Sequence, residues 1–178
     1  MGDQRSVLQL PIDGGLTCLR GLSPRRTRFE VEYALERGSC HNSFLFNSSE
    51  PAKPAVLVHP PGATFTEPFL ASLNELLKPE QPLQVVQGNV NPDRVALLHA
   101  LVRQRPHLEL VVSNAGAKLL DELWDRQKPG SDAPAPPPQP PRTVIKQDTN
   151  LALPDGRELE VLAVPTPRWP GGLVALDR

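Results

Sequence analysis

The sequence predicts a mixed α/β sandwich in which helices pack on a sheet. Two observations support this prediction. Short β-rich runs dominate the first third of the chain, and strand-like runs then alternate with segments whose apolar residues recur at helical spacing. With 178 residues and 39% apolar content, the chain is long enough to bury one hydrophobic core of ordinary size.

The composition argues against several classes of protein. The net charge is -1 and only 4% of residues are aromatic, so a basic, aromatic-rich nucleic-acid surface is not expected. The apolar run Val7–Ile12 is interrupted by a proline and is too short for a signal peptide or a membrane span. Cys18 and Cys40 form no C-x-x-C pair and indicate a reducing compartment, with both thiols as small apolar filler. We therefore expect a cytoplasmic protein.

The predicted strands are short runs rich in β-branched and aromatic residues, bounded by turn-forming residues. Before the proline-rich segment they are Leu16–Leu22, Phe29–Tyr33, Asn42–Phe46, Ala55–His59, Leu83–Gly88 and Leu108–Val112. After it they are Arg142–Lys146, Leu159–Val164 and Gly172–Leu176. Asp155-Gly156 marks a β-turn between the first two of these later strands.

Three helices are predicted from apolar residues at helical spacing. The first carries Phe65, Phe69, Leu73, Leu76 and Leu77 and ends at Pro79; the second carries Val95, Leu98, Leu101 and Val102; the third carries Leu119, Leu120, Leu123 and Trp124. The second helix has Asn91 as a predicted N-cap and Pro92 as its first residue, and Ser113-Asn114 caps the third.

The segment Pro129–Pro141 interrupts this pattern with seven prolines. It predicts an extended, solvated loop without a core of its own. A tolerated surface insertion is the simpler interpretation, and a docking site for a proline-recognising partner is the alternative.

The stretch Leu83–Arg94 is the predicted centre of the molecule, because a strand ends there just before a helix begins. Side chains of such a loop lie over the edge of the sheet, where ligand and metal sites are commonly built. We expect Arg168 to reach the same place from late in the chain.

Several runs of the sequence resemble the flavodiiron proteins (diflavin flavoproteins), in the form found in photosynthetic microbes. These runs are Thr17–Tyr33, His41-Asn42-Ser43-Phe44-Leu45, Val56–Phe65, Asn89–Arg94, Val111–Leu120 and Val164–Gly171. The resemblance implies a metallo-β-lactamase-like αββα sandwich, of which residues 1–178 supply an incomplete part with a proline-rich insertion at 129–141. It also implies a di-iron centre in the sandwich domain, and separate flavodoxin-like FMN and flavin reductase domains that are absent from this chain.

The resemblance also identifies the positions of the iron ligands. The family's loop has the pattern His-x-Glu-x-Asp-His, and here it has Asn89-Val90-Asn91-Pro92-Asp93-Arg94. A further family histidine precedes a Trp-Pro pair, and here that position is Arg168. Of these five positions, only position 93, with Asp93, still has a side chain of the kind that ligates iron.

These replacements predict that the loop binds no iron. Arginine is permanently protonated and offers only donors, so Arg94 and Arg168 cannot ligate a cation. Our hypothesis is that the two arginines replace the charge of the irons and that Asp93 forms an ion pair with one of them. The alternatives are that the arginines are solvent-exposed and that Asn91 is simply an N-cap. His41, His59, His99 and His107 show no metal-ligand spacing and are expected to be loop or surface residues.

Two functions remain open. The first is a part of a flavodiiron enzyme that reduces oxygen to water with electrons from NAD(P)H through flavin. The second is a metal-free assembly module that pairs, as a homo- or hetero-dimer, with a flavodiiron subunit that has its full ligand set. For the isolated chain we expect no catalysis, no bound cofactor and an unpaired final strand that exposes a sheet edge.

Overall fold

The computed structural model describes residues 5–28, 33–47, 50–126 and 134–177. Its main element is a sheet of seven strands whose spatial order follows the chain. These strands are β1 (Ser6–Pro11), β2 (Leu16–Ser23), β3 (Ser39–Phe46), β4 (Ala55–Val58), β5 (Leu83–Val86), β6 (Leu108–Ser113) and β7 (Arg142–Ile145).

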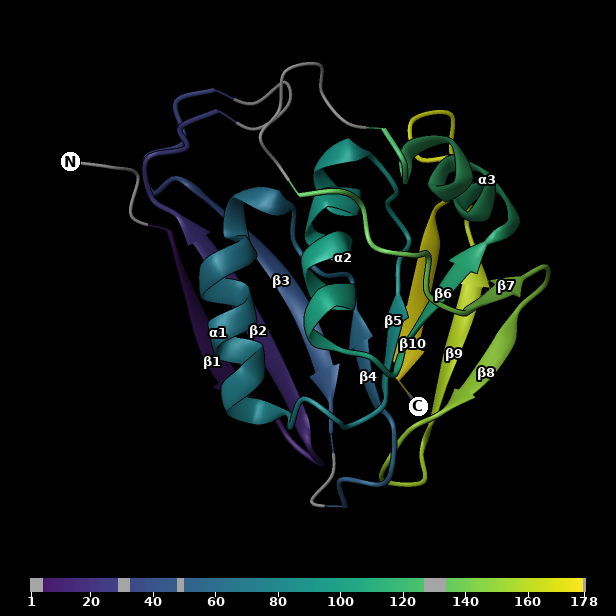
Figure 1. Cartoon of the computed structure of the whole chain (residues 1–178). Helices are drawn as coiled ribbons and strands as arrows, with labels where there is room; N and C mark the ends of the chain where they lie inside the picture. The colour runs from purple at the N-terminus through teal and green to yellow at the C-terminus, as the bar shows by residue number, and fades with distance from the viewer. Residues whose placement is uncertain (1–4, 29–32, 48–49, 127–133, 178) are drawn as a thin grey trace.

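The direction of the strands changes at β4. The pairings from β1 to β4 are antiparallel, whereas those from β4 to β7 are parallel. Parallel neighbours need a crossover connection, and a helix is the usual form. Here the crossovers contain α1 (Thr66–Leu76, preceded by the short 3-10 helix η1, Ala63–Phe65), α2 (Pro92–Gln104) and α3 (Asn114–Leu123). Figure 1 shows these helices in front of the large sheet.

The helices cover one face of the large sheet because their apolar residues fall on one side. The core between the helices and the large sheet is a cluster of buried residues that includes Leu73, Leu98, Leu101 and Trp124. The predicted caps fix the start of two helices. Asn91 accepts a hydrogen bond from the backbone N–H of Arg94 (2.9 Å), and the Ser113 hydroxyl accepts one from the backbone N–H of Gly116 (3.1 Å).

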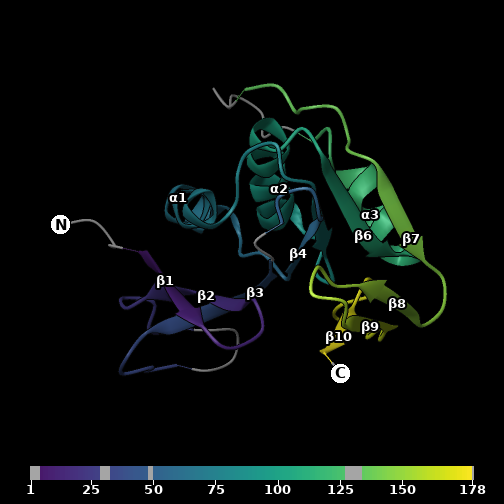
Figure 2. The ribbon, with the colours of Figure 1, turned by 90° about the horizontal axis from the view of Figure 1, so that it is seen from below.

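The opposite face of the large sheet packs against a second, antiparallel sheet of three strands. Its strands are β8 (Thr149–Ala152), β9 (Glu158–Ala163) and β10 (Leu173–Asp177), in the order β10-β9-β8. A second apolar cluster lies between the sheets and includes Val56, Val86, Val111, Leu159 and Val161. Figure 2 shows the resulting layers, with the helices on one side and the small sheet on the other.

The predicted α/β sandwich is confirmed, with differences in single elements. The run at Val7 forms the edge strand β1, which was not predicted, and neither was β8. Gly156 has a φ of +92° in the turn between β8 and β9, where a turn was expected. The predicted strand Phe29–Tyr33 lies outside the described residues, except for Tyr33. The expectation of an unpaired final strand was wrong, because β10 pairs with β9.

Residues 134–141 of the proline-rich segment run extended along the helical side of the molecule to the start of β7 (Figure 1). The segment is tied to the helices. The Trp124 indole N–H donates to the Pro137 carbonyl (2.7 Å), and Arg103 donates to the Ala135 carbonyl (2.8 Å). The described part is therefore extended as predicted, but it is anchored. No helix among the described residues is long and apolar enough to cross a membrane.

Candidate functional site

A cavity of about 580 Å³, which we call the Arg94 cavity, lies at the carboxyl ends of the parallel strands β4 and β5. This is the edge where open parallel sheets usually place their ligand sites. The loop after β4, the loop after β5, the start of α2 and the turn before β10 all contribute to its wall. Its lining includes His41, His59, Gly62, Asn89, Asp93, Arg94 and Trp169.

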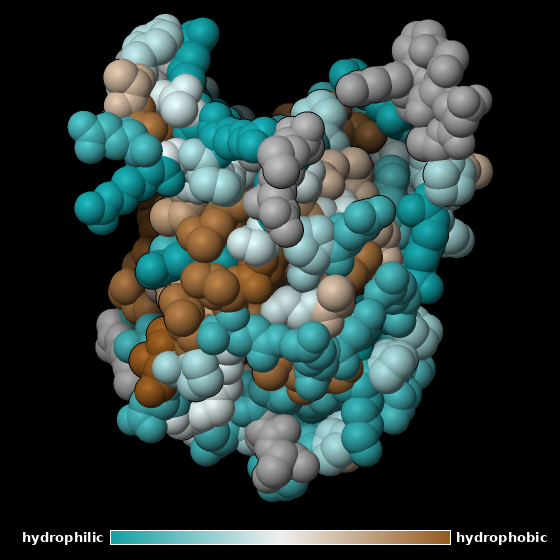
Figure 3. Space-filling model, turned by 90° about the vertical axis from the view of Figure 1, so that its left-hand side faces the viewer, coloured by the Kyte–Doolittle hydropathy of each residue, from teal (hydrophilic) through white to brown (hydrophobic). Residues whose placement is uncertain are grey.

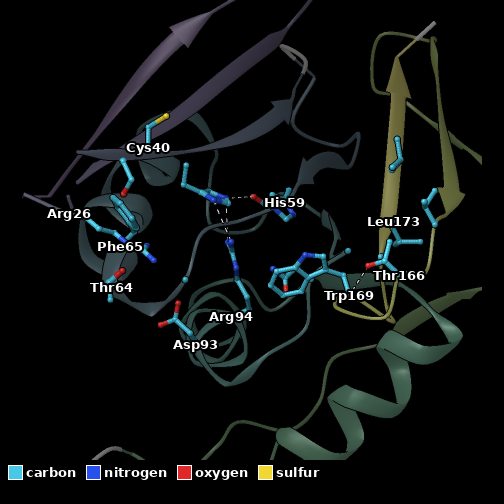
Figure 4. Close-up of a pocket in the computed structure, with 18 residues that line it drawn as sticks. Arg26, Cys40, His59, Thr64, Phe65, Asp93, Arg94, Thr166, Trp169 and Leu173 are labelled. Atoms are coloured by element: carbon cyan, nitrogen blue, oxygen red, sulfur yellow. Dashed lines mark hydrogen bonds between the residues drawn. The ribbon is translucent and has the colours of Figure 1, made fainter. Parts of the chain in front are cut away.

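Arg94, in the first turn of α2, is the side chain around which the cavity is arranged (Figure 4). Its Nη1 donates a hydrogen bond to the carbonyl of Pro60, in the loop after β4. Its Nη1 and Nη2 atoms lie 3.3 Å and 3.4 Å from the Nε2 and Nδ1 atoms of His41, on β3. Arg94 therefore ties a helix to two separate parts of the sheet edge.

His41 and His59 form a pair whose ring centroids are 5.0 Å apart. The His59 carbonyl lies 2.9 Å from His41 Nε2 and accepts a second hydrogen bond, also 2.9 Å, from the Ser43 hydroxyl. Because a carbonyl can only accept, we assign the proton of His41 to Nε2, which leaves a lone pair on Nδ1 toward Arg94. His59 has a φ of +59°, a left-handed conformation that its two carbonyl contacts hold in place.

Both imidazoles are neutral at pH 7. Burial, and then the positive charge of Arg94, lowers the pKa of His41 to about 4. Burial, Arg94 and then His41 lower the pKa of His59 to about 4 as well. Burial also lowers the pKa of Arg94, and the charge of Asp93 partly opposes this shift. A guanidinium stays protonated nonetheless, so Arg94 keeps a fixed positive charge in the cavity.

Asp93 is exposed and its carboxylate lies against the backbone of Gly62. A Cβ atom at residue 62 would lie 1.7 Å from Asp93 Oδ2, so a larger residue there requires this carboxylate to move. Within the described part of the chain, Asp93 forms no ion pair within 4 Å with either Arg94 or Arg168. The predicted ion pair was therefore wrong. Arg94 instead bonds a carbonyl oxygen and contacts an imidazole.

Of the other predicted site residues, Asn89 lines the Arg94 cavity, whereas Asn91 and Arg168 lie beside it. Asn91 caps α2, and its amide group also donates to Asn89 Oδ1 (3.3 Å). Asn89, Asn91 and Arg168 line a second, smaller cavity of about 240 Å³, and both Asn89 and Trp169 line the two cavities. Arg168 is exposed, with its guanidinium 5.7 Å from the centre of the Trp169 ring. The two arginines thus lie near the same loop but line different cavities.

Comparison with known proteins identifies the family. The chain is 34% identical over 173 residues to diflavin flavoprotein A 6 of Nostoc sp.. This match covers 97% of the chain and 28% of the relative. The chain belongs to the diflavin flavoprotein (flavodiiron) family. No family model matches it.

Solved flavodiiron structures agree with this assignment. The metal-soaked Flv1 flavodiiron core from Synechocystis sp. superimposes with a TM-score of 0.81 at 32% identity, covering 97% of this chain and 40% of that one. A fragment, residues 1–254, of diflavin flavoprotein A 5 from Nostoc sp. gives a TM-score of 0.80 at 29% identity, covering 97% of this chain and 62% of the fragment. The fold is thus the metallo-β-lactamase-like core of flavodiiron proteins. The chain spans about a quarter of the length of the curated relatives it matches.

The loop residues of this flavodiiron chain do not fit a di-iron centre. Non-haem iron takes imidazole nitrogens and carboxylate oxygens. Here the loop offers one exposed carboxylate (Asp93), two amides that bond each other (Asn89 and Asn91) and a cation (Arg94). Among the described residues, no three His, Cys, Asp or Glu side chains cluster closely enough to hold a metal ion.

The contact between the two histidines of this flavodiiron chain, His41 and His59, was not predicted from the sequence. Both were expected to be loop or surface residues, because no ligand spacing relates them. His59 does lie in the loop after β4, whereas His41 lies half-buried on β3. One signal was present. His59 directly follows a buried strand, as the Asn89–Arg94 loop does, and adjacent parallel strands end at the same edge of a sheet.

Proposed function

We propose that the protein containing this chain is a flavodiiron oxidoreductase that reduces oxygen to water. Its electrons would come from NAD(P)H and pass through flavin. The relatives named diflavin flavoprotein support this proposal, as does the similarity to the Flv1 flavodiiron core. We place the flavodoxin-like FMN domain and the flavin reductase domain outside residues 1–178, and the protein in the cytoplasm.

We further propose that this chain's own loop takes no part in iron binding. The position of the Arg94 guanidinium is the observation that carries the proposal. It donates to the Pro60 carbonyl and lies within 3.4 Å of the His41 ring nitrogens, inside the cavity that the loop lines. A divalent ion about 4 Å from this charge would be repelled by about 8 kcal/mol at an effective dielectric constant of about 20.

The same observation favours a second function, that of a metal-free assembly module. In this case the sandwich would be retained for pairing with a flavodiiron subunit that has its full ligand set. The partner could be a second copy or a related chain, and the oxygen chemistry would take place in the partner's sandwich.

Exposed apolar side chains support the proposal that residues 1–178 are part of a larger sandwich. Leu8 is 44% exposed and Ile12 is 57% exposed, near the free edge of the large sheet, and Figure 3 shows apolar surface on this side of the molecule. Val174 and Leu176, each 41% exposed, lie on the edge strand of the small sheet. Large apolar patches on a soluble domain usually mark a surface that another element covers.

Metal and flavin analysis of the full-length protein tests these proposals. We expect FMN but no iron when the protein is purified alone, and iron only when it is purified with a ligand-complete flavodiiron subunit. Oxygen consumption with NAD(P)H then separates the two functions. Flavin-dependent consumption by the protein alone would contradict the assembly module, and two tightly bound irons per subunit would contradict the metal-free loop.

A further inference from the structure

Three exposed residues form a ridge on the outer edge of the segment that joins α3 to β7. We call Ala135, Pro138 and Pro141 the proline ridge. Six of the eight residues at positions 134–141 are prolines, each of which fixes its own φ and keeps the preceding residue extended. Such a chain adopts the polyproline II helix, which has three residues per turn. Residues spaced three apart therefore share one edge, and this edge faces solvent.

The opposite edge of the same segment faces the protein. Pro137 and Pro140 are half-buried, and the carbonyl of Pro137 accepts the hydrogen bond from Trp124, whose side chain is fully buried. Arg103 donates to the carbonyl of Ala135 at 2.8 Å and to that of Pro134 at 3.4 Å. The segment is therefore held in one orientation, with its ridge outward.

The end of the segment is also fixed. Arg142 forms two hydrogen bonds to the carboxylate of Asp121, of 2.7 Å and 3.1 Å, and a third to Gln139 at 3.2 Å. The charge of Arg142 is thus already paired within the chain. A partner would therefore bind the ridge through apolar contacts with its prolines. It would not need a carboxylate to pair with Arg142.

We propose that the proline ridge is a docking surface for a partner domain with an aromatic-lined groove. Grooves of this kind bind polyproline II segments through the apolar proline rings. Binding is more favourable when the segment is already ordered, because less conformational entropy is lost. Here the hydrogen bonds of Trp124 and Arg103 order it before any partner arrives, which lowers the entropic cost of binding. This surface is separate from the Arg94 cavity, so the inference does not depend on the proposed function.

Titration calorimetry with the 178-residue chain tests the proposal, with a set of purified SH3 and WW domains as probes. We expect at least one domain to bind. The double variant Pro138→Ala, Pro141→Ala should then bind at least tenfold more weakly. The matched control is Pro54→Ala, an exposed proline outside the ridge, which should bind like the wild type. Circular dichroism of each variant checks that the fold is retained.

A second variant tests the contribution of anchoring. Trp124→Phe keeps an aromatic ring but removes the N–H that bonds Pro137, so binding should weaken severalfold although the ridge residues are unchanged. Equal binding by Trp124→Phe would contradict the anchored ridge. The docking proposal is overturned if no domain binds the chain while the same domains bind a free proline-rich peptide, or if the double alanine variant binds like the wild type.

Discussion

The guanidinium of Arg94 lies against the imidazole of His41, with the closest pair of nitrogen atoms 3.3 Å apart. A cation beside an imidazole is compatible with a stable fold only if the ring stays neutral. Burial and the charge of Arg94 lower the pKa of His41 to about 4 and so meet this condition, although the hydrogen bond of the ring to the His59 carbonyl acts in the opposite direction. The arginine thus links the start of α2 to β3 and to the loop after β4.

Replacing Arg94 by methionine should destabilise the chain by about 1–3 kcal/mol. The methionine can fill space, but it leaves the Pro60 carbonyl without its donor, and an unsatisfied buried acceptor costs about this much. The pKa values of His41 and His59 should rise, because the positive charge that lowers both is gone. Urea unfolding and NMR titration of the imidazoles measure these two effects.

Arg168→Met is the matched control for this experiment. Arg168 is exposed and lines a different cavity, so its replacement should change the unfolding free energy by no more than about 0.5 kcal/mol. Equal losses from the two variants would contradict the central role assigned to Arg94.

The sequence predicted the features of this region that depend on local chemistry. The Asn91 cap and the start of α2 follow from residues within a few positions of each other, although β5 ends at Val86 rather than at the predicted Gly88. The contacts of Arg94 could not be predicted in the same way, because Pro60 and His41 are 34 and 53 positions away. Only the sheet topology brings them together. Pairing residues of opposite charge in the sequence favoured Asp93, which is the wrong partner.

Two strands were missed for a related reason. The run at Val7 contains Gln9 and ends at Pro11, so it lacks the clean alternation of a central strand. As the edge strand β1 it tolerates both residues, and Gln9 even donates to Glu75 of α1 (2.5 Å). β8 has only four residues, and its strand character depends on pairing with β9.

Acid should destabilise the fold through the histidine pair. The folded pKa of each imidazole is about 4, below its ordinary value of 6.5, so the unfolded state binds protons first as the pH falls. Stability is therefore retained above pH 6.5 and lost between about pH 6.5 and 4, by up to about 3 kcal/mol for each histidine. Urea unfolding at a series of pH values measures this loss. The variant His41→Asn, His59→Asn should show a flatter profile in this range, and an unchanged profile would contradict the assignment.

Arg105 should contribute to stability in a different way. Its side chain is 1% exposed and donates to the carbonyls of Leu77 and Lys78, next to the end of α1. Arg105→Met should leave the Leu77 carbonyl without a donor, whereas the Lys78 carbonyl keeps the one from the backbone N–H of Gln81. We expect a cost of about 2 kcal/mol, measured by urea unfolding. The exposed Lys118→Met is the control and should cost less than about 0.5 kcal/mol. A loss no larger than that of the control would show that the buried charge itself costs as much as its hydrogen bonds contribute.

Gly62 and Asp93 should be energetically coupled. Gly62→Ala introduces a Cβ that would lie 1.7 Å from Asp93 Oδ2, so either the carboxylate or the loop must move. Because this carboxylate belongs to an exposed side chain that can turn toward solvent, we expect a loss of about 1 kcal/mol, at the low end of the cost of overpacking. Removing the carboxylate with Asp93→Ala should relieve much of this loss, because the methyl group then has room.

A double-mutant cycle measures the coupling between the two residues. Asp93→Asn serves as its control, because the amide has the shape of the carboxylate and should not relieve the clash. If Asp93→Ala and Asp93→Asn rescued Gly62→Ala equally well, the charge of Asp93 rather than its volume would be the reason for glycine at position 62. If neither variant rescued it, the loop after β4 would require glycine for another reason, and the close approach of Asp93 would not explain it.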